Sequence, residues 1–428
     1  MLSTVSDLRG LPDYPGPRRR CPARAGPRVW RETSAPPVLG KETKVRKDFS
    51  RLAFFSFSSA NKLKQLFACR LSLFSFRQEN GKGSGGERKT NGEERFANSV
   101  SLIDKYGRDI HDLRISITDR CNYKCVYCRS GNDGPSFPEM SIADYLRMVR
   151  VFVSLGITKV RLTGGEPLLR RGLVEMAAEL GKMRTLAGRP LDIAITTNGH
   201  LLAELAQPLA DVGLSRVTVS MDAVEPQHFA RITRVPNGYE RVLAGIRAAQ
   251  RAGLNPVKVN CVLLRGFNDD QIVGFGKFAR EEGVVVRFIE FMPLEEDRVW
   301  SPEIVITLDE IVRRMAEFIP LREIEHARSE TARRYVFEDG VGEIGIIAPV
   351  SHPFCGQCSR IRVTSDGKIR TCLFSVREHD LAGLMARGAN DDEIAEFIQR
   401  AVDQKEARHH IGEPGFVPAS RTMVHIGG

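Results

Sequence analysis

The chain has 428 residues, of which 42% are hydrophobic, and a formal net charge of +10. This length suits one large domain with an appendage, or two to three domains. The positive charge is confined to residues 1–98, which carry 20 Lys and Arg against 9 Asp and Glu; residues 99–428 carry 43 against 44. This distribution disfavours a nucleic-acid partner bound across the fold. No run of 18 or more apolar residues occurs, so we expect no membrane partner or membrane span.

Residues 1–98 differ in composition from the rest of the chain. The first 40 are rich in Pro, Gly and Arg, residues 43–77 mix Phe, Leu, Ser and basic residues, and residues 79–95 are polar and Gly-rich. We expect a disordered basic extension. The alternatives are an organelle-targeting segment, or a bacterial protein whose start codon has been assigned too far upstream. The expected location is the cytoplasm, or the mitochondrial matrix if residues 1–98 are a transit segment.

From about residue 110, short apolar strands alternate with amphipathic helices. The expected strands are 113–118, 159–163, 192–197, 216–221, 257–264 and 285–291. The expected helices begin at Ser141 or lie near 171–186, 200–211, 239–252, 268–282 and 307–318, and several end at Gly213, Gly253 or Gly283. Six such units predict parallel strands with right-handed crossovers. Because a full barrel needs eight units, we predict an α/β fold, an incomplete (β/α)6 TIM-like barrel, with a doubly wound open sheet as the alternative.

The C-terminal third has a different pattern. Strands are expected at 333–338, 343–348 and 360–371, a helix near 391–403, and an extended tail from Gly412 to Gly428. We therefore divide the folded part into a barrel domain at 99–320 and a C-terminal extension at 321–428.

Three cysteines follow the first expected strand with the spacing C-x3-C-x2-C: Cys121, Cys125 and Cys128. Three thiolates this close in sequence can ligate three irons of a 4Fe–4S cluster and leave the fourth iron open to a substrate or cofactor. The alternatives are a zinc site or incidental thiols. Zinc sites usually add a second cysteine pair or histidines, and no fourth ligand lies nearby in the sequence.

A second cysteine group has the spacing C-x2-C-x13-C and consists of Cys355, Cys358 and Cys372. It again offers three ligands and one open position. Zinc is the alternative here, with His352 as a possible fourth ligand. Because six of the nine cysteines fall into two groups with ligand-like spacing, we expect metal binding in a reducing compartment rather than disulfides.

Small polar residues follow several expected strands, where functional groups of barrels are found. Thr163-Gly164-Gly165-Glu166-Pro167 follows the second strand, Thr196-Thr197-Asn198-Gly199 the third, and Ser220-Met221-Asp222 the fourth. Paired glycines let the backbone approach a ligand, and Glu166 with nearby carbonyls can receive an ammonium group. The alternative is a tight turn from strand to helix.

Basic residues also lie on the expected strands, at Arg114, Lys159, Arg161, Lys258, Arg287, Arg360 and Arg362. An unpaired charge inside a barrel is costly, so this pattern predicts a bound anion. The alternative is that some of these residues face outward or pair with acids such as Glu290. The sequence has no G-x4-G-K-[ST] loop, so side chains would have to hold a polyphosphate.

The first cysteine motif, the Gly-Gly-Glu-Pro motif and the polar strand ends together resemble the radical S-adenosylmethionine superfamily. In that superfamily the open iron binds the amino and carboxylate groups of S-adenosylmethionine, and cleavage of the sulfonium gives a 5′-deoxyadenosyl radical. With the second cysteine group added, residues 100–428 resemble the GTP 3′,8-cyclase (MoaA) family, which begins molybdenum cofactor biosynthesis. The resemblance implies two 4Fe–4S clusters, S-adenosylmethionine as cofactor and GTP as substrate, with guanine at the second cluster.

The resemblance also assigns expected roles to individual residues. Catalytic roles fall to Arg114 and to the terminal Gly427 and Gly428, which would reach into the active site. Cofactor-binding roles fall to Tyr127, Gly164, Gly165, Glu166, Thr197, Ser220, Asn260 and Met292. Substrate-binding roles fall to Arg114, Lys159, Arg161, Lys258, Arg287, Arg360 and Arg362.

The expected partners are a cyclic pyranopterin monophosphate synthase that uses the product and a second copy of the chain in a homodimer; no motif identifies the electron donor. Two other readings stay open. One is a different radical S-adenosylmethionine enzyme with an auxiliary cluster, such as a peptide-modifying maturase, although those carry more C-terminal cysteines. The other is a protein without enzymatic activity that binds zinc or an iron–sulfur cluster and binds nucleic acid through its basic N-terminal extension.

Overall fold

The structure is a computed structural model that describes residues 101–128, 137–295, 298–325, 327 and 330–427. The extension predicted for residues 1–98 and the terminal Gly428 lie outside the described residues. The fold below is that of the described chain from residue 101 onward.

Six parallel strands follow one another around a curved sheet, with each strand paired to the next. They are β1 (Asp112–Ser116), β2 (Lys159–Thr163), β3 (Asp192–Thr197), β4 (Arg216–Ser220), β5 (Lys258–Leu263) and β6 (Val285–Glu290). Every strand lies within two residues of its predicted bounds, because each is a short apolar run with clear breaks on both sides. The partial barrel predicted from the sequence is therefore confirmed.

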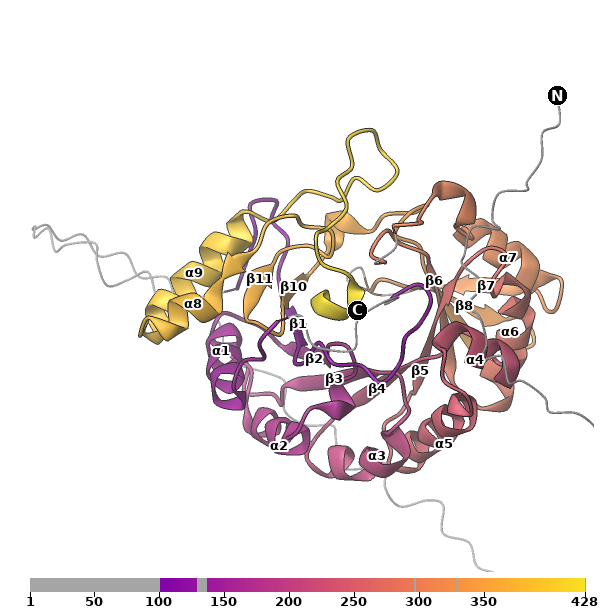
Figure 1. Ribbon diagram of the computed structural model, residues 1–428, viewed down its shortest axis with the longest axis horizontal. Helices are drawn as coiled ribbons and strands as arrows, with labels where there is room; N and C mark the ends of the chain where they lie inside the picture. The colour runs from indigo at the N-terminus through magenta and orange to yellow at the C-terminus, as the bar shows by residue number, and fades with distance from the viewer. Residues whose placement is uncertain (1–100, 129–136, 296–297, 326, 328–329, 428) are drawn as a thin grey trace, which may run out of the picture. The chain divides into compact units, whose positions relative to one another are not determined.

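Helices cover the outer face of this sheet (Figure 1). They are α1 (Ile142–Ser154), α2 (Leu173–Lys182), α3 (Leu202–Asp211), α4 (Pro226–Thr233), α5 (Gly238–Arg251), α6 (Ile272–Glu281) and α7 (Leu308–Ala316). Ser141 caps α1 as predicted, because its side chain accepts a hydrogen bond from the Asp144 amide. Short 3-10 helices occupy Pro167–Leu169, Asp269–Gln271, Pro302–Ile304 and Cys355–Gln357. The eight-residue α4 was not predicted; it begins at a proline, which suits the first turn of a helix.

The C-terminal extension adds a parallel strand to each edge of the six-stranded section. β9 (Glu343–Ile347) pairs with β6, and β10 (Arg360–Val363) pairs with β1. In the described residues no pairing joins β9 to β10, so the barrel stays open. The remaining strands are antiparallel and lie beyond these two: β7 (Leu321–Ile324), β8 (Arg333–Phe337), β11 (Lys368–Arg370) and β12 (His379–Asp380).

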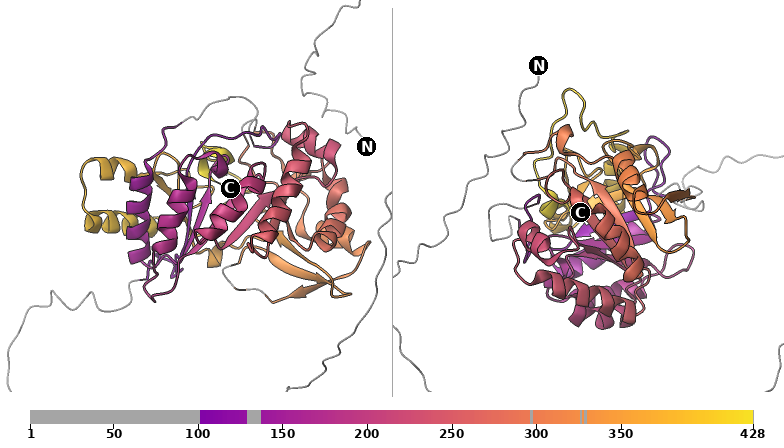
Figure 2. Two further views of the ribbon diagram at one scale, coloured as in Figure 1. Left: turned by 90° about the horizontal axis from the view of Figure 1, so that it is seen from below. Right: turned by 90° about the vertical axis from the view of Figure 1, so that its right-hand side faces the viewer.

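Two C-terminal predictions were wrong. The single strand expected at 360–371 is a hairpin of β10 and β11, which turns at Gly367 with a φ of +75°. The tail expected to be extended contains a short helix, α10 (Met423–Ile426). The helix predicted at 391–403 is confirmed as α9 (Asp391–Asp403), and with α8 (Leu381–Ala386) it lies beyond α1 at one end of the row of helices (Figure 2).

The main core lies between the sheet and its helices and is built from aliphatic and aromatic side chains along the whole barrel section. A smaller cluster, which includes Leu294, Phe374 and Ile426, packs the C-terminal tail against the barrel. None of the described helices is both long and apolar enough to cross a membrane.

Glu290, at the end of β6, joins three parts of the fold. Its buried carboxylate accepts hydrogen bonds from the amides of Leu308 (3.0 Å), Val350 (2.8 Å) and Ser351 (2.9 Å). Leu308 begins α7, and Val350 lies just after β9. Glu290 is therefore occupied by backbone donors and does not neutralise the cations on the strands, which the sequence had left open.

We expect Glu290→Ala to lower the free energy of unfolding by about 3 kcal/mol, because it leaves the buried Leu308 amide and the part-buried Val350 and Ser351 amides without an acceptor. Glu281→Ala, at the exposed end of α6, is the control and should change the stability by less than about 0.5 kcal/mol. Urea unfolding followed by circular dichroism measures both. Equal stability of the two variants would contradict this role of Glu290.

Candidate active site

One cavity of about 270 Å³ lies inside the barrel, and all six cysteines of the two motifs line it. The two groups are more than 200 positions apart in the sequence. Both groups reach this cavity because β10 runs parallel to β1, with Arg360 opposite Asp112. Cys358 therefore lies at the amino end of these two strands, whereas the loop with Cys121, Cys125 and Cys128 follows the carboxyl end of β1. The two cysteine groups thus lie at opposite ends of the cavity.

The loop that carries Cys121, Cys125 and Cys128 is fixed by backbone hydrogen bonds to the end of α4. The Val126 amide donates to the Ile232 carbonyl at 3.0 Å, and the Cys128 amide donates to the Cys125 carbonyl at 3.0 Å. Burial raises the pKa of the Cys125 thiol well above its usual value, and the nearby Asp222 adds to the rise. A metal ion in contact with the sulfur would remove this penalty on the thiolate.

The second group lies on the segments that flank β10 and β11. Cys355 begins a 3-10 helix, Cys358 follows it, and Cys372 lies just after β11. The Arg108 guanidinium donates to the Cys355 carbonyl at 2.9 Å and to the Ala407 carbonyl at 2.9 Å, which fixes the first of these segments. His409, rather than the predicted His352, is the histidine on the cavity wall.

These donor sets fit iron–sulfur clusters. Each end of the cavity offers three thiols, and soft thiolate ligands suit such clusters. Within the described ranges, no three Cys, His, Asp or Glu side chains form a group arranged around a single metal ion. Three cysteines spaced around one side of a cavity are the arrangement that a cluster with one open iron requires.

The Gly164–Gly165 pair packs directly against the backbone that leads into the first cysteine loop. A Cβ atom on Gly164 would collide with the Thr118 carbonyl, and one on Gly165 with the Arg120 carbonyl. The Gly165 amide donates to the Thr118 carbonyl at 2.8 Å, which links the two loops. Both glycines also line the cavity, so they serve loop packing as well as any approach to a ligand.

Glu166 is fully buried behind this wall. Its carboxylate accepts hydrogen bonds from the Leu168 amide (2.9 Å), the Thr197 hydroxyl (2.6 Å) and the Asn198 amide (2.6 Å). Burial raises the pKa of Glu166 to about 7, against the lowering effect of these donors. The predicted contact of Glu166 with an ammonium group stays a prediction; what the contacts give is a fixed position for Thr197 and Asn198, which line the cavity.

The other predicted cofactor-binding residues lie on the cavity wall: Tyr127, Thr197, Ser220, Asn260 and Met292. The Tyr127 hydroxyl donates to Asp222 at 2.6 Å, and Asp222 also accepts from the Val262 amide at 2.8 Å. Burial raises the pKa of Asp222 to about 6, although both hydrogen bonds lower it. Asp222 thus fixes the position of the Tyr127 hydroxyl beside the first cysteine group.

Five of the seven predicted substrate-binding cations line the cavity: Arg114, Arg161, Arg287, Arg360 and Arg362. Lys159 and Lys258 do not; each begins its strand, two residues before Arg161 and Asn260 respectively. The side-chain period of two predicts that these lysines share a face with Arg161 and Asn260, but it could not show whether their side chains line the cavity.

No ion pair joins any of these five arginines to a carboxylate of the described chain. Arg161 donates to the hydroxyls of Thr196 (3.2 Å) and Thr218 (3.3 Å), and Arg287 donates to Asn260 at 2.9 Å. The Nε of Arg114 is buried and has no hydrogen-bond partner in the described residues. Burial, followed by repulsion from the other arginines, lowers the pKa of Arg287 to about 9. These arginines therefore suit the binding of an anion in the cavity.

The C-terminal tail enters this cavity. Met423 and Val424 line it, and the Gly427 carbonyl accepts a hydrogen bond of 2.8 Å from Arg362. Gly427 has a φ of +77°, and a Cβ atom there would collide with the Thr163 hydroxyl. Glycine is therefore required at residue 427 by both conformation and space.

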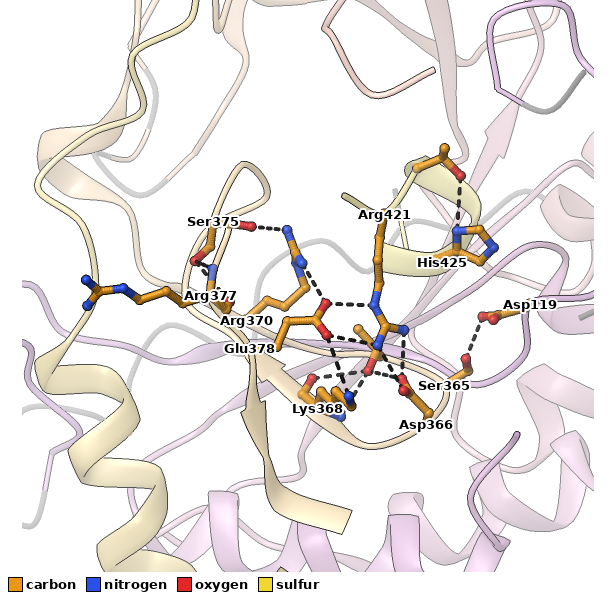
Figure 3. Close-up of polar contacts among 12 residues, drawn as sticks. Asp119, Ser365, Asp366, Lys368, Arg370, Ser375, Arg377, Glu378, Arg421 and His425 are labelled. Carbon is orange, nitrogen blue, oxygen red and sulfur yellow. Dashed lines mark hydrogen bonds and ion pairs between the residues drawn. The ribbon is translucent and has the colours of Figure 1, made fainter. Parts of the chain in front are cut away.

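Arg421 anchors the tail at its entry (Figure 3). Its guanidinium forms two hydrogen bonds of 2.9 Å to Asp366 and pairs with Glu378 at 2.7 and 2.9 Å. The same group lies 3.8 Å from the centre of the Phe137 ring. Because only 5% of the Arg421 side chain is exposed, these contacts fix the start of the segment that ends at Gly427.

Several wall residues were missed by the sequence analysis: Thr331, Ile347, Pro349, Phe354, Thr371, Leu373, Phe374 and His409. Phe354, Thr371, Leu373 and Phe374 lie within two residues of a predicted cysteine ligand, and this proximity is a signal that could have found them. His409 follows a helix of ordinary pattern, and nothing in the sequence marks it.

Two family models match the chain. Residues 115–279 match the Radical SAM superfamily, and residues 284–411 match Molybdenum Cofactor Synthesis C. The chain is 43% identical over 297 residues to the GTP 3′,8-cyclase of Xanthomonas axonopodis pv. citri, covering 68% of this chain and 88% of the relative. It is 39% identical over 331 residues to the GTP 3′,8-cyclase of Syntrophomonas wolfei, and the match covers 76% of this chain and 100% of that relative. A solved structure of Streptococcus suis SuiB bound to S-adenosylmethionine is 14% identical, with a TM-score of 0.48 over 68% of each chain.

We expect Gly427→Ala to displace the tail from the cavity, because the new methyl group meets Thr163 and the residue has a positive φ. Hydrogen exchange of the amides of residues 422–427 should become at least about tenfold faster. Gly415→Ala is the matched control, because Gly415 also has a positive φ but a Cβ atom there meets open space. Unchanged exchange in the Gly427 variant would contradict the placement of the tail.

We also expect the stability to depend on pH through Glu166. Its folded-state pKa of about 7 lies above the usual 4.5, so its contribution is complete below pH 4.5 and is lost as the pH rises through 7. The unfolding free energy of the wild type should fall by about 3 kcal/mol relative to Glu166→Gln between pH 4.5 and 8. Any pH-independent cost of the substitution appears only as a constant offset.

The matched control for this pH dependence is Glu240→Gln, on the exposed face of α5. Chemical unfolding of the protein without metals at each pH measures the difference. Parallel pH profiles for the wild type and Glu166→Gln would contradict the assignment.

Proposed function

The chain belongs to the GTP 3′,8-cyclase family, and from this membership we propose how the residues of its cavity divide the work of the reaction. The protein is a radical S-adenosylmethionine enzyme, a lyase that converts GTP to 3′,8-cyclo-7,8-dihydro-GTP in the first step of molybdenum cofactor biosynthesis. Its cofactors are two 4Fe–4S clusters and S-adenosylmethionine. The observation that carries the division of roles is the set of unneutralised arginines between the two cysteine groups.

Cys121, Cys125 and Cys128 hold the first cluster in this proposal. With S-adenosylmethionine bound, this cluster would supply the electron for radical chemistry at the ribose of GTP. The polar strand ends position the cofactor: carbonyls beside Gly164 and Gly165 receive its ammonium group, and Thr197, Ser220 and Asn260 offer hydrogen bonds. Tyr127, fixed by Asp222, and Met292 supply contact surface on the same side.

Arg114, Arg161 and Arg287 bind the triphosphate of GTP. Their guanidinium groups project from three different strands into one space, which suits several phosphate oxygens at once. Lys159 and Lys258 add positive charge two residues before Arg161 and Asn260, at the amino ends of the same strands. Burial lowers the pKa of Lys258 to about 8, so most of its charge is retained at neutral pH.

Cys355, Cys358 and Cys372 hold the second cluster, which anchors the guanine base at the other end of the cavity. Arg360 and Arg362 lie beside it on β10. This arrangement fixes GTP at both its base and its phosphates, so the ribose lies between the two cysteine groups. Holding the reacting carbon atoms in one geometry supplies much of the rate and the selectivity.

Gly427 and Gly428 complete the active site from the tail. The Gly427 carbonyl fixes one edge of the Arg362 guanidinium and leaves its other donors for substrate. The tail also fills space through which water would reach the ribose, and exclusion of water protects a carbon radical from side reactions.

The remaining assignments concern partners and context. We propose that a cyclic pyranopterin monophosphate synthase consumes the product and that the chain works as a homodimer. The division into a barrel at 99–320 and a cluster-binding extension at 321–428 is also a proposal, as is a cytoplasmic location, with the mitochondrial matrix as the alternative.

The activity is tested by anaerobic reconstitution with iron and sulfide, followed by addition of reductant, S-adenosylmethionine and GTP. We expect about eight irons per chain, 5′-deoxyadenosine formation that depends on GTP, and a cyclised nucleotide. Equal deoxyadenosine formation with and without GTP, and no new nucleotide, would overturn the assignment. Zinc in place of iron at the second site would remove the guanine-anchoring role.

Arg161→Gln tests the triphosphate site. Loss of one charge-assisted contact should weaken GTP binding by about tenfold to a hundredfold, without loss of iron. Equilibrium dialysis with GTP measures the affinity, and guanosine should bind the variant and the wild type equally. Arg251→Gln, on the exposed end of α5, is the control. Equal GTP affinity of the wild type and Arg161→Gln would contradict the role of Arg161.

A further inference from the structure

Lys405 is a buried cation beside the second cysteine group that the roles above do not use. Its side chain is 3% exposed, and its ammonium donates hydrogen bonds to the Arg360 carbonyl at 3.0 Å and to the Thr371 carbonyl. Arg360 follows Cys358 by two residues, and Thr371 immediately precedes Cys372. One ammonium group therefore ties together the two chain segments that carry two of the three ligands.

The position of Lys405 is set by a regular element. It follows α9 directly, and its amide donates to the Val402 carbonyl at 2.9 Å. α9 packs against α1, at the end of the row of barrel helices (Figure 2). The backbone at Lys405 therefore has a fixed position. A flexible surface lysine would have no such constraint.

The first cysteine group has the opposite surroundings. The Asp222 carboxylate lies there and accepts a hydrogen bond of 2.6 Å from the hydroxyl of Tyr127, which stands between Cys125 and Cys128 in the sequence. The two ends of one cavity therefore differ in sign: a fixed cation lies at the second group and a carboxylate at the first.

A buried ammonium without a counter-charge is costly. Within the described residues Lys405 forms no ion pair; its two hydrogen-bond acceptors are neutral carbonyls. The neighbouring Glu406 is its nearest candidate, but that carboxylate accepts a hydrogen bond of 2.7 Å from the Thr371 hydroxyl and its pKa is lowered by several donors besides Lys405. Three thiolates with a bound cluster supply the negative charge that this position lacks.

We propose that Lys405 is a positioning residue of the second cluster: it holds the Cys358 and Cys372 segments together, and its charge makes that cluster easier to reduce. One-electron reduction adds one negative charge to a cluster, so a fixed cation nearby stabilises the reduced state and raises the midpoint potential. The electron comes from the external reductant of the titration. This inference rests on the proposed second cluster at Cys355, Cys358 and Cys372.

The test compares three variants of the full chain after anaerobic reconstitution. Lys405→Arg keeps the charge and the donors, Lys405→Gln keeps a donor without charge, and Lys405→Met removes both. Arg408→Met is the control, because it removes an exposed cation three residues along the same segment. Iron content and redox titration monitored by electron paramagnetic resonance are measured for each, and again with Cys121, Cys125 and Cys128 replaced by alanine so that only the second cluster is seen.

We expect Lys405→Gln to lower the ratio of reduced to oxidised second cluster at a fixed potential by at least about tenfold, which is about 59 mV for a one-electron couple. Lys405→Arg and Arg408→Met should match the wild type, and the first cluster should be unaffected. Loss of second-cluster iron in both neutral variants, with retention in Lys405→Arg, also supports the proposal. An unchanged potential with full iron content in Lys405→Gln and Lys405→Met would overturn it, as would loss of iron in Lys405→Arg.

Failure of the proposed function gives a different result. If the second site held zinc or no metal, the wild type itself would contain about four irons and show one reducible cluster. If the second cluster is present but its potential ignores residue 405, only the present inference fails.

Discussion

Five arginine side chains lie inside this barrel without an ion pair to any carboxylate of the described chain, and the architecture of the site depends on that charge. The Asp112 carboxylate attracts Arg114 and Arg161 without forming an ion pair. Hydroxyl and amide groups contact these arginines at positions where a carboxylate would neutralise their charge. Thr218, for example, accepts hydrogen bonds from both Arg161 and Arg287. Burial lowers the pKa of Arg287 only to about 9, so it stays cationic at neutral pH. Repulsion among these arginines therefore destabilises the fold, and a polyanionic substrate removes that repulsion. The attraction between the arginines and the phosphates also contributes to selectivity for a triphosphate.

The C-terminal extension turns an open six-stranded section into a two-ended cavity. β9 and β10 lengthen the parallel sheet at both edges, and β10 brings the second cysteine group to the end of the cavity opposite the first. The tail then enters the remaining opening, held by Arg421 at its start and by Arg362 at Gly427 (Figure 3). Each step depends on the previous one, which explains why residues at opposite ends of the chain meet at one site.

Local patterns in the sequence were sufficient for the barrel strands, the helix caps and both cysteine groups, because each depends on neighbours within a few residues. Long-range features were not predictable in the same way. The hairpin at Gly367 and the short helix α10 depend on tertiary packing. The side-chain period of two predicts that Lys159 shares a face with Arg161, but it could not show that Lys159 does not line the cavity. Three donors of its own chain surround the Glu166 carboxylate, which no local pattern indicated; its contact with a ligand stays a prediction.

The central claim is that two three-cysteine clusters lie at opposite ends of one arginine-lined cavity. An anomalous difference map at the iron edge, from anaerobic crystals of the reconstituted protein with GTP, tests it most directly. The account predicts two four-iron peaks, one beside Cys121, Cys125 and Cys128 and one beside Cys355, Cys358 and Cys372, with the triphosphate on the arginines between them. A single iron peak, a mononuclear peak at the second group, or GTP bound away from the arginines would contradict the account.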